Sequence, residues 1–294
     1  MCSLSSYRQA GRYGFMMNRD ERRGRAEGDV TQMEQCIFPT DALAGGTWAG
    51  VNRQGLALGL LNLYQRQKDA AGQHAWQSRG GIIPQLLASV THVQQLEAAL
   101  LAMPLSSFQA FTLVAMDRKT SLCFTWTGDV LTSSPLEPNE AGVSFLSSSS
   151  VDTLNILSYR QRLFEEHWQI LSPQHEADIE GSVEPYVEAY AQSDVVMNKT
   201  SINTRRIAEP FGEELCDQVM FEEALSAFHL YQPRTYESES VFMSREKTHT
   251  KSLLHISVAD RSRLTYLADT QLQACHTELI NAHDWQTRAM TYVC

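Results

Sequence analysis

The sequence predicts an α+β fold, in which strands and helices occupy separate stretches of the chain. Two observations lead to this prediction. Strand-forming segments separated by glycine-containing turns fill the first third of the sequence. Helical periodicity appears in one central segment and then in a longer block, with strands between and after them. Runs segregated in this way fit an α+β arrangement better than a repeating βαβ sheet.

Two hairpins are expected near the N-terminus. The first joins strands over 2–8 and 14–21 through the glycine-containing turn "QAGRYG". The second joins "GGTWAGV" (45–51) to "LALGLLNLY" (56–64) through "NRQG", a turn with asparagine and glycine at its ends. The first hairpin is expected to bring Cys2 close to the "NRDE" segment.

The remaining elements follow from periodicity and from capping signals. Helices are expected over 91–103, 152–171, 181–192 and 218–230, and strands over 108–117, 120–129, 142–150, 239–246, 251–259 and 262–268, before a C-terminal helix or loop. Thr91 and Asp152 are the expected N-caps of the first two helices. One stripe of the second helix carries Leu154, Leu157, Phe164, Trp168 and Leu171. Because no repeat or linker interrupts the chain, one domain over 1–294 is expected.

Composition excludes several classes of function. The 294 residues carry a net charge of −10, which argues against a surface for nucleic acid or anionic membrane. No apolar run approaches the ~18 residues of a transmembrane segment, and no secretory signal is evident. The six cysteines are scattered without a C-x-x-C pair, which suits reduced thiols. We therefore expect a cytoplasmic protein that acts on a small molecule.

The chemistry suggested by the sequence centres on Cys2, which directly follows Met1. Removal of Met1 would leave one residue with a thiol and an α-amine, whose unperturbed pKa is about 7.7–8.0. The amine would act as the base and the thiolate as the nucleophile. With 6 cysteines in 294 residues, however, chance puts a cysteine at a given position about 2% of the time. The position of Cys2 therefore needs support from other residues.

Other polar and aromatic residues supply candidate partners for Cys2. Asp20 is placed to hold the ammonium group, and Arg19 to favour the thiolate. Asn62, at the end of the second hairpin, offers an amide donor for an oxyanion. The alternative to these catalytic roles is a purely structural one, in which "NRDE" is a polar strand end and Asn62 is a turn residue. Trp48 and Tyr64 flank this hairpin and suit either a substrate pocket or the core.

Four motifs within residues 1–81 occur together in a recognisable order. "MCSLSSY", "MNRDE", "GGTWAGVNRQGLALGLLN" and "QSRGG" resemble the NRDE family, also called the TANGO2 (transport and Golgi organisation 2) family. The later "FMSREKTHTKSLLHISV" resembles the C-terminal strands of bacterial members more weakly. The N-terminal layout is also similar to N-terminal-nucleophile (Ntn) hydrolases of the choloylglycine hydrolase and penicillin V acylase type.

This resemblance implies a fold, an activity and a set of site residues. The implied fold is a four-layer αββα sandwich of the Ntn-hydrolase type. The implied activity is cleavage of a linear amide bond, or acyl transfer. Carried over from the acylases, Cys2 is the nucleophile, Asn62 helps to form the oxyanion hole, and Arg19 and Asp20 orient the centre.

The sequence departs from the acylase pattern at three places. Arg19 and Asp20 are adjacent here, and adjacent strand residues face opposite sides unless a bulge intervenes. Without a bulge, Asn18 and Asp20 share one face and Arg19 points away from it. Ser148 stands where the acylases have an asparagine, and Arg245 is a candidate for the arginine that the acylases have late in their sequence. Both residues are predicted to bind substrate.

Two hypotheses from different classes follow. The first is an N-terminal-cysteine hydrolase or acyltransferase that acts on the linear amide bond of a small substrate. The second is a non-catalytic member of the family that binds or traffics a small hydrophobic ligand, such as haem or lipid. No cofactor is expected. No metal site is expected either, because His249 and His255 share a strand face but lack further residues at ligand spacing.

Overall fold

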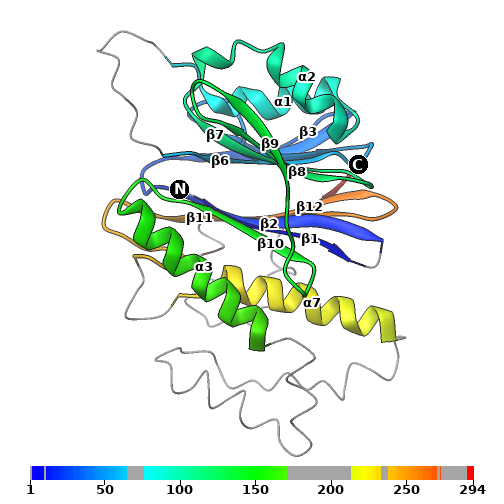
Figure 1. Ribbon diagram of the computed structural model, residues 1–294, viewed down its shortest axis with the longest axis vertical. Helices are drawn as coiled ribbons and strands as arrows, with labels where there is room; N and C mark the ends of the chain where they lie inside the picture. The colour runs from blue at the N-terminus through cyan, green and yellow to red at the C-terminus, as the bar shows by residue number, and fades with distance from the viewer. Residues whose placement is uncertain are drawn as a thin grey trace, which may run out of the picture.

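The computed structural model contains two antiparallel β-sheets packed face to face between two layers of helix (Figure 1). It describes residues 2–9, 11–64, 76–170, 213–232, 238–269, 272 and 290–294. The fold is therefore of the α+β class. Its layers follow the αββα order that the resemblance to Ntn hydrolases implied.

One sheet contains the N-terminal hairpin and has six strands among the described residues, in the order β10-β1-β2-β11-β12-β13. Each strand is antiparallel to its neighbours. The strands are β1 (Cys2–Gln9), β2 (Arg12–Arg22), β10 (Val143–Ser148), β11 (Thr248–Val258), β12 (Ser262–Ala268) and β13 (Met290–Val293). Although β1 opens the chain, it is an interior strand with a partner along each edge.

The other sheet has seven strands among the described residues, and their order follows the chain. They are β3 (Glu27–Gln32), β4 (Cys36–Asp41), β5 (Ala49–Asn52), β6 (Ala57–Asn62), β7 (Phe111–Met116), β8 (Ser121–Trp126) and β9 (Leu131–Pro135). All neighbouring pairs are antiparallel, so every strand pairs with the next one along the chain.

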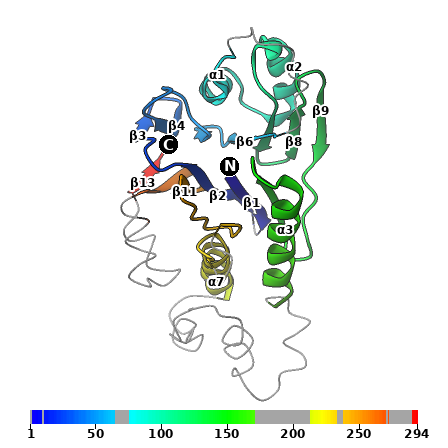
Figure 2. The ribbon, with the colours of Figure 1, turned by 90° about the vertical axis from the view of Figure 1, so that its left-hand side faces the viewer.

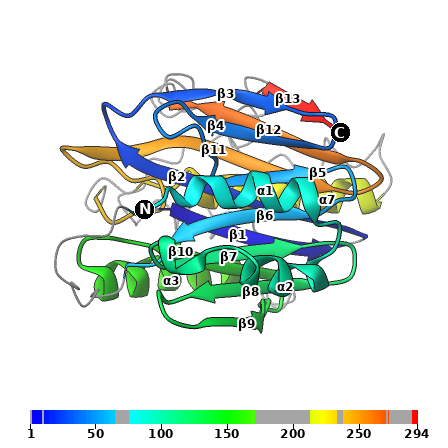
Figure 3. The ribbon, with the colours of Figure 1, turned by 90° about the horizontal axis from the view of Figure 1, so that it is seen from above.

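Helices cover the outer face of each sheet (Figures 2 and 3). The seven-stranded sheet is covered by α1 (Ile82–Ser89) and α2 (Leu96–Leu101), and the six-stranded sheet by α3 (Thr153–Ile170) and α7 (Glu213–His229). Short 3-10 turns span Arg79–Gly81, Val93–Gln95 and Leu105–Ser107. Within the described ranges, no helix combines the length and apolar character needed to cross a membrane.

Hydrophobic side chains fill the three spaces between the four layers. On β2, Phe15 and Met17 pack between the sheets, whereas Met16 packs against the α3 and α7 layer. Successive residues of a strand point to opposite faces, so a strand buried on both faces has apolar residues in a row. Ile83 of α1 and Phe111 of β7 belong to the third space, under the outer helices.

Both expected hairpins are confirmed by the strand pairing. The first joins β1 to β2, and the second joins β5 to β6. In the second turn Gly55 has φ +86°, a conformation that favours glycine, and its carbonyl accepts a hydrogen bond of 2.7 Å from the Tyr13 hydroxyl. Asn52 stabilises this turn, because its side-chain oxygen accepts the Leu56 backbone N–H at 2.9 Å.

Several other expected elements are present with changed details. The expected helix over 91–103 is a 3-10 turn followed by α2. Its N-cap is His92 rather than Thr91, and His92 forms a capping box with Gln95, whose side chain accepts the His92 backbone N–H at 3.2 Å. The expected helix over 152–171 is α3. On α3 Leu154 is 80% exposed, so the buried stripe is shifted from the expected one.

The actual stripe of α3 runs through Ile156, Arg160, Phe164 and Trp168, at a spacing of four. The expected helix over 218–230 corresponds to α7, and the one over 181–192 lies outside the described residues. The sequence pattern did not predict β3, β4, β9, α1 or β13. Two of these, β3 and β9, are largely polar and lack an apolar alternation.

The strand expected over 239–246 is wrong. This stretch runs through turns, apart from an isolated bridge between Ser244 and His249. Val241, Phe242 and Met243 are consecutive apolar residues and are all buried. This segment therefore packs in the interior without forming the regular hydrogen bonds of a β-strand. The Met243 backbone N–H instead donates to the Thr250 hydroxyl at 2.8 Å.

The shared strand face expected for His249 and His255 is also wrong. A β-bulge in β11 lies between Thr250 and Ser252. One extra residue reverses the alternation of side chains, so the two histidines point to opposite faces. His255 consequently contacts the Tyr7 hydroxyl at 2.9 Å, on the helical side of the six-stranded sheet.

We expect Gly14→Ala to destabilise the sheet around β2. A Cβ atom at this position would lie 1.9 Å from the Ile256 carbonyl oxygen of β11, whereas one at Gly24 would meet nothing within 4 Å. Gly14→Ala should therefore lower the free energy of unfolding by at least about 1–3 kcal/mol, and Gly24→Ala should leave it nearly unchanged. Urea unfolding followed by circular dichroism measures both. Equal stability of the two variants would contradict the close approach.

Candidate active site

Cys2 is the first residue of β1 and lies at the end of an interior strand. It pairs with Arg19 of β2 on one side and with Ser148 of β10 on the other. Its side chain is largely buried, with the residue 7% exposed. Its backbone nitrogen donates a hydrogen bond of 3.0 Å to the Ser148 hydroxyl. The nitrogen that would become the α-amine on removal of Met1 therefore has a hydroxyl partner.

The surroundings of the Cys2 thiol favour its protonated form. Burial raises the pKa of the thiol, and the negative charge of Asp20 acts in the same direction. The positive charge of Arg19 and a hydrogen bond from the Asp20 backbone act to lower this pKa, but their effect is smaller than that of burial. Formation of the thiolate therefore requires a base close to the sulfur.

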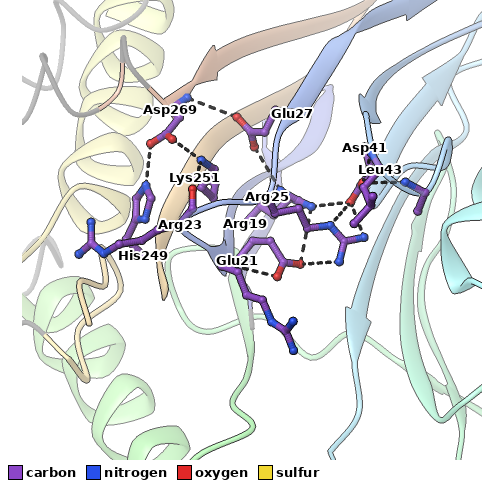
Figure 4. Close-up of polar contacts among 12 residues, drawn as sticks. Arg19, Glu21, Arg23, Arg25, Glu27, Asp41, Leu43, His249, Lys251 and Asp269 are labelled. Atoms are coloured by element: carbon purple, nitrogen blue, oxygen red, sulfur yellow. Dashed lines mark hydrogen bonds and ion pairs between the residues drawn. The ribbon is translucent and has the colours of Figure 1, made fainter. Parts of the chain in front are cut away.

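Arg19 lies on the same face of the sheet as Cys2, because directly paired residues of antiparallel strands point to the same side. Its guanidinium contacts Asp41 at 2.6 Å and Glu27 at 3.4 Å (Figure 4). The guanidinium carbon also lies 4.5 Å from the centroid of the Trp48 ring. Arg19 is thus held by protein groups on several sides.

Asp41 fixes two arginines at once. Its carboxylate contacts Arg19 and Arg25, the latter at 2.8 Å, and accepts the backbone N–H groups of Leu43 and Ala44 at 3.0 Å. Burial alone would raise the pKa of Asp41. The hydrogen bonds from Ala44 and Arg25 and the two positive charges outweigh burial and hold this pKa below its ordinary value.

Glu27 connects this group to charged residues of the other sheet (Figure 4). Its carboxylate accepts the Asp269 backbone N–H at 3.3 Å, and the Asp269 carboxylate contacts His249 at 2.6 Å and also Lys251. Burial raises the pKa of Glu27, while Arg19 acts to lower it. Because β3 and β4 belong to one sheet and β2 and β11 to the other, this polar cluster joins the two sheets at the Cys2 end.

Asp20 faces the helical layer instead. Its carboxylate accepts a hydrogen bond from the Thr250 hydroxyl at 2.7 Å and pairs with Arg160 of α3 at 3.4 Å. Both side chains of this ion pair are fully buried. Arg160 also donates to the Ser3 hydroxyl at 3.0 Å. A buried pair of this kind needs such extra hydrogen bonds to offset the cost of desolvation.

Asn18 lies on the same side as Asp20. Its side-chain amide donates to the backbone carbonyls of His229 at 2.8 Å and Val241 at 3.0 Å. The strand β2 pairs with β1 in unbroken register. Of the two residues that the sequence left open, Arg19 therefore shares the face of Cys2, and Asn18 faces the helices.

A small pocket lies beside Ser148, the pairing partner of Cys2. It is lined by Leu61, Asn62, Leu63, Tyr64, Thr112, Leu146, Ser147, Ser148, Ser149, Thr153 and Leu157. The Asn62 amide donates to the Tyr64 hydroxyl at 3.1 Å. The buried Ser147 hydroxyl has no hydrogen-bond partner within the described part of the chain. The pocket thus combines apolar and polar lining residues, one of which, Ser148, is hydrogen-bonded to the Cys2 nitrogen.

Two residues expected to contact substrate lie outside this pocket. Trp48 is 7% exposed and packs between the sheets, with its ring 6.3 Å from that of Tyr266. Arg245 donates to the Ser238 carbonyl at 2.6 Å and is within electrostatic reach of Asp20, on the helical side. By contrast, Asn62, Tyr64 and Ser148 are brought together.

Three charged residues near the site were missed in the sequence. Arg160 is one of them, and its spacing of four from Ile156 and Phe164 is a signal for burial that could have been read. Asp41 has no local signal, because its partners come from distant strands. Arg79 belongs to the "QSRGG" motif, which was used only for the resemblance.

The layers and the cysteine at the start of a central strand agree with the layout implied by the resemblance to Ntn hydrolases. The family model for Transport and Golgi organisation 2 (TANGO2) matches residues 1–292, so the chain belongs to this family. A comparison with curated proteins found no match.

Two similar solved structures have low sequence identity to this chain. The Caenorhabditis elegans ortholog of N-acylethanolamine-hydrolyzing acid amidase is 13% identical, with a TM-score of 0.42 over 68% of this chain and 88% of that chain. A mutant of the conjugated bile acid hydrolase from Clostridium perfringens is 12% identical, with a TM-score of 0.42 over 91% of this chain and 89% of that chain.

The stabilising effect of Asp41 should depend on pH. Because folding lowers the pKa of Asp41, its contribution is complete above the ordinary aspartate pKa of about 3.9 and is lost as the pH falls through the folded-state value. We expect Asp41→Asn to lower the free energy of unfolding by roughly 2 kcal/mol at pH 7, and by clearly less at pH 3. Asp29→Asn, at an exposed position of β3, is the control. An Asp41→Asn effect that is constant or larger in acid would contradict this assignment.

Proposed function

We propose that this protein is an N-terminal-cysteine hydrolase or acyltransferase that acts on the linear amide bond of a small molecule. One observation carries the proposal. The Cys2 nitrogen is hydrogen-bonded to Ser148, which lines a pocket that also contains the Asn62 amide and the Tyr64 hydroxyl. The proposed base, the Cys2 nitrogen, is thus linked through Ser148 to a pocket that contains amide and hydroxyl donors.

In this proposal Met1 is removed, and the α-amine of Cys2 takes the proton of the thiol. The sulfur attacks the amide carbon, a C–S bond forms, and the carbonyl π electrons move to oxygen. When the tetrahedral intermediate collapses, the C–N bond breaks, and the Cys2 ammonium protonates the departing amine. Water then hydrolyses the thioester to a carboxylic acid, or another nucleophile takes the acyl group.

Asn62 is the proposed donor to the developing oxyanion. Its amide nitrogen carries two hydrogens, and only one of them is used by Tyr64. The hydroxyl of Tyr64 can in turn donate into the pocket, so two neighbouring donors are available. Ser148 is proposed to hold the α-amine. Arg19 and the backbone N–H of Asp20 are proposed to orient and stabilise the thiolate, because both lower the pKa of the thiol.

A second function is supported by a different observation. The thiol of Cys2 is largely buried and its pKa is raised, as in a structural cysteine, and the neighbouring pocket has several leucines. These features suit a TANGO2-family protein that binds or traffics a small hydrophobic ligand, such as haem or lipid, without turning it over. We rank this second because it assigns no role to the Ser148 contact.

The cytoplasm is the proposed location of the protein. The described cysteines Cys2, Cys36, Cys123 and Cys294 are free thiols, as is usual in a reducing compartment. One domain over 1–294 and a small-molecule substrate are also parts of this proposal.

An electrophilic amide probe should label Cys2 selectively. We expect Cys2→Ser to block labelling, and Asn62→Ala to slow it by roughly 100- to 1,000-fold because a donor to the oxyanion is lost. Asn155→Ala changes an exposed asparagine of α3 and is the matched control. The measurement is the rate of labelling against probe concentration, with peptide mapping to locate the label and circular dichroism to confirm folding.

Two outcomes would contradict the proposed roles. Unchanged labelling in Asn62→Ala would remove this residue from the oxyanion site. Turnover of an amide substrate by Cys2→Ser at the original rate would remove Cys2 as the nucleophile and favour the ligand-binding function.

A further inference from the structure

The "QSRGG" segment is held against the "GGTW" segment by a contact between two glycines. A Cβ atom at Gly46 would lie 2.4 Å from the Gly80 carbonyl carbon, so only glycine allows the two backbones to come this close. The Thr47 backbone N–H donates to the Gly80 carbonyl at 2.9 Å. The backbone next to Arg79 is therefore fixed in place.

The side chain of Arg79 reaches the end of β6. One guanidinium nitrogen donates to the Ala110 carbonyl at 2.7 Å. The same carbonyl accepts the backbone N–H of Leu63 at 3.2 Å. Leu63 lies between Asn62 and Tyr64 in the chain, so the guanidinium is located next to the two polar residues proposed for the oxyanion site.

The positive charge of Arg79 is not neutralised by any carboxylate in the described ranges. Burial lowers the pKa of Arg79, and the ionised forms of Tyr64 and Cys2 act to raise it. Both groups are therefore within electrostatic reach of the guanidinium. Partial burial of a cation without a carboxylate partner in the described ranges is unfavourable, and a bound anion would offset that cost.

The neighbouring pocket is suited to an apolar chain. Leu61, Leu63, Leu146 and Leu157 contribute to its lining. The buried Ser147 hydroxyl, which has no partner in the described part of the chain, is available to a polar atom of a ligand. Asn62 and Tyr64 line this pocket, and the Arg79 guanidinium contacts the same Ala110 carbonyl as the backbone of Leu63 between them.

We propose that Arg79 binds an anionic group of the substrate, and that the substrate is an N-acyl compound with an apolar acyl chain and a carboxylate. The guanidinium forms a charge-assisted, bidentate contact with the carboxylate, and the leucines contact the acyl chain. The amide between them lies beside Cys2. The identity of the reacting bond rests on the function proposed above, whereas the binding of the anion does not.

A pair of ligands that differ only in charge tests this inference. N-Lauroylglycine carries a carboxylate, and N-lauroylglycinamide has a neutral amide in its place. Binding to the Cys2→Ala variant, measured by calorimetry, separates recognition from turnover. We expect the carboxylate to bind about 10- to 100-fold more tightly than the amide, since an ion pair with hydrogen bonds is lost in the latter.

Variants of Arg79 should change this preference and little else. In the Cys2→Ala background, Arg79→Met should remove the preference for the carboxylate while leaving binding of the neutral ligand unchanged. Arg79→Lys should keep part of the preference, because the charge remains but the bidentate geometry is lost. Arg53→Met, at an exposed position on the turn after β5, is the control and should keep the full preference. Circular dichroism confirms that each variant is folded.

The outcomes separate this inference from the proposed function. Equal affinity for the two ligands, equal losses for both ligands in Arg79→Met, or no binding of either ligand would overturn the role of Arg79. If the carboxylate binds through Arg79 but the protein with Cys2 releases no glycine from N-lauroylglycine and no probe labels Cys2, the hydrolase function fails and the anion site stands.

Discussion

The strand β1 pairs along both of its edges, with β2 and with β10, and this double pairing determines where Cys2 lies. A strand that begins the chain and still occupies the interior of a sheet brings its first residue to the end of the two packed sheets. There the Cys2 nitrogen meets Ser148 at the end of β10, and the pocket includes the end of β6 from the opposite sheet. Backbone hydrogen bonds on both sides hold the residue, so few side chains are needed to place it.

Charged groups on the two faces of β2 then define the environment of the thiol. On the face toward the other sheet, Arg19 is held by Asp41 and Glu27. On the face toward the helices, Asp20 is paired with Arg160. Each of these groups is largely buried, so each needs its partners to offset the cost of desolvation. The adjacent residues Arg19 and Asp20 therefore form ion pairs in different layers. Arg19 pairs between the two sheets, and Asp20 pairs beneath α3.

The sequence was most informative where a local signal and a local structure coincide. Glycine-containing turns predicted both hairpins, and the resemblance carried by the N-terminal motifs implied the four layers. The polar edge strands β3 and β9 were missed because their stability comes from a neighbouring strand rather than from an apolar pattern. The partners of Arg19 and Asp20 were missed because Asp41 and Arg160 reach them only through the tertiary fold. The bulge in β11 likewise has no signal in the sequence, and it separates His249 from His255.

The proposed chemistry depends on the nitrogen and the sulfur of Cys2 acting together as base and nucleophile. This requires a free α-amine, since an amide nitrogen has no basic electron pair available at neutral pH. The most direct measurement is the intact mass of protein purified from its native host, with the N-terminal peptide sequenced by tandem mass spectrometry. We expect a chain that begins at Cys2 with an unmodified amine. A dominant species that retains Met1 would contradict it.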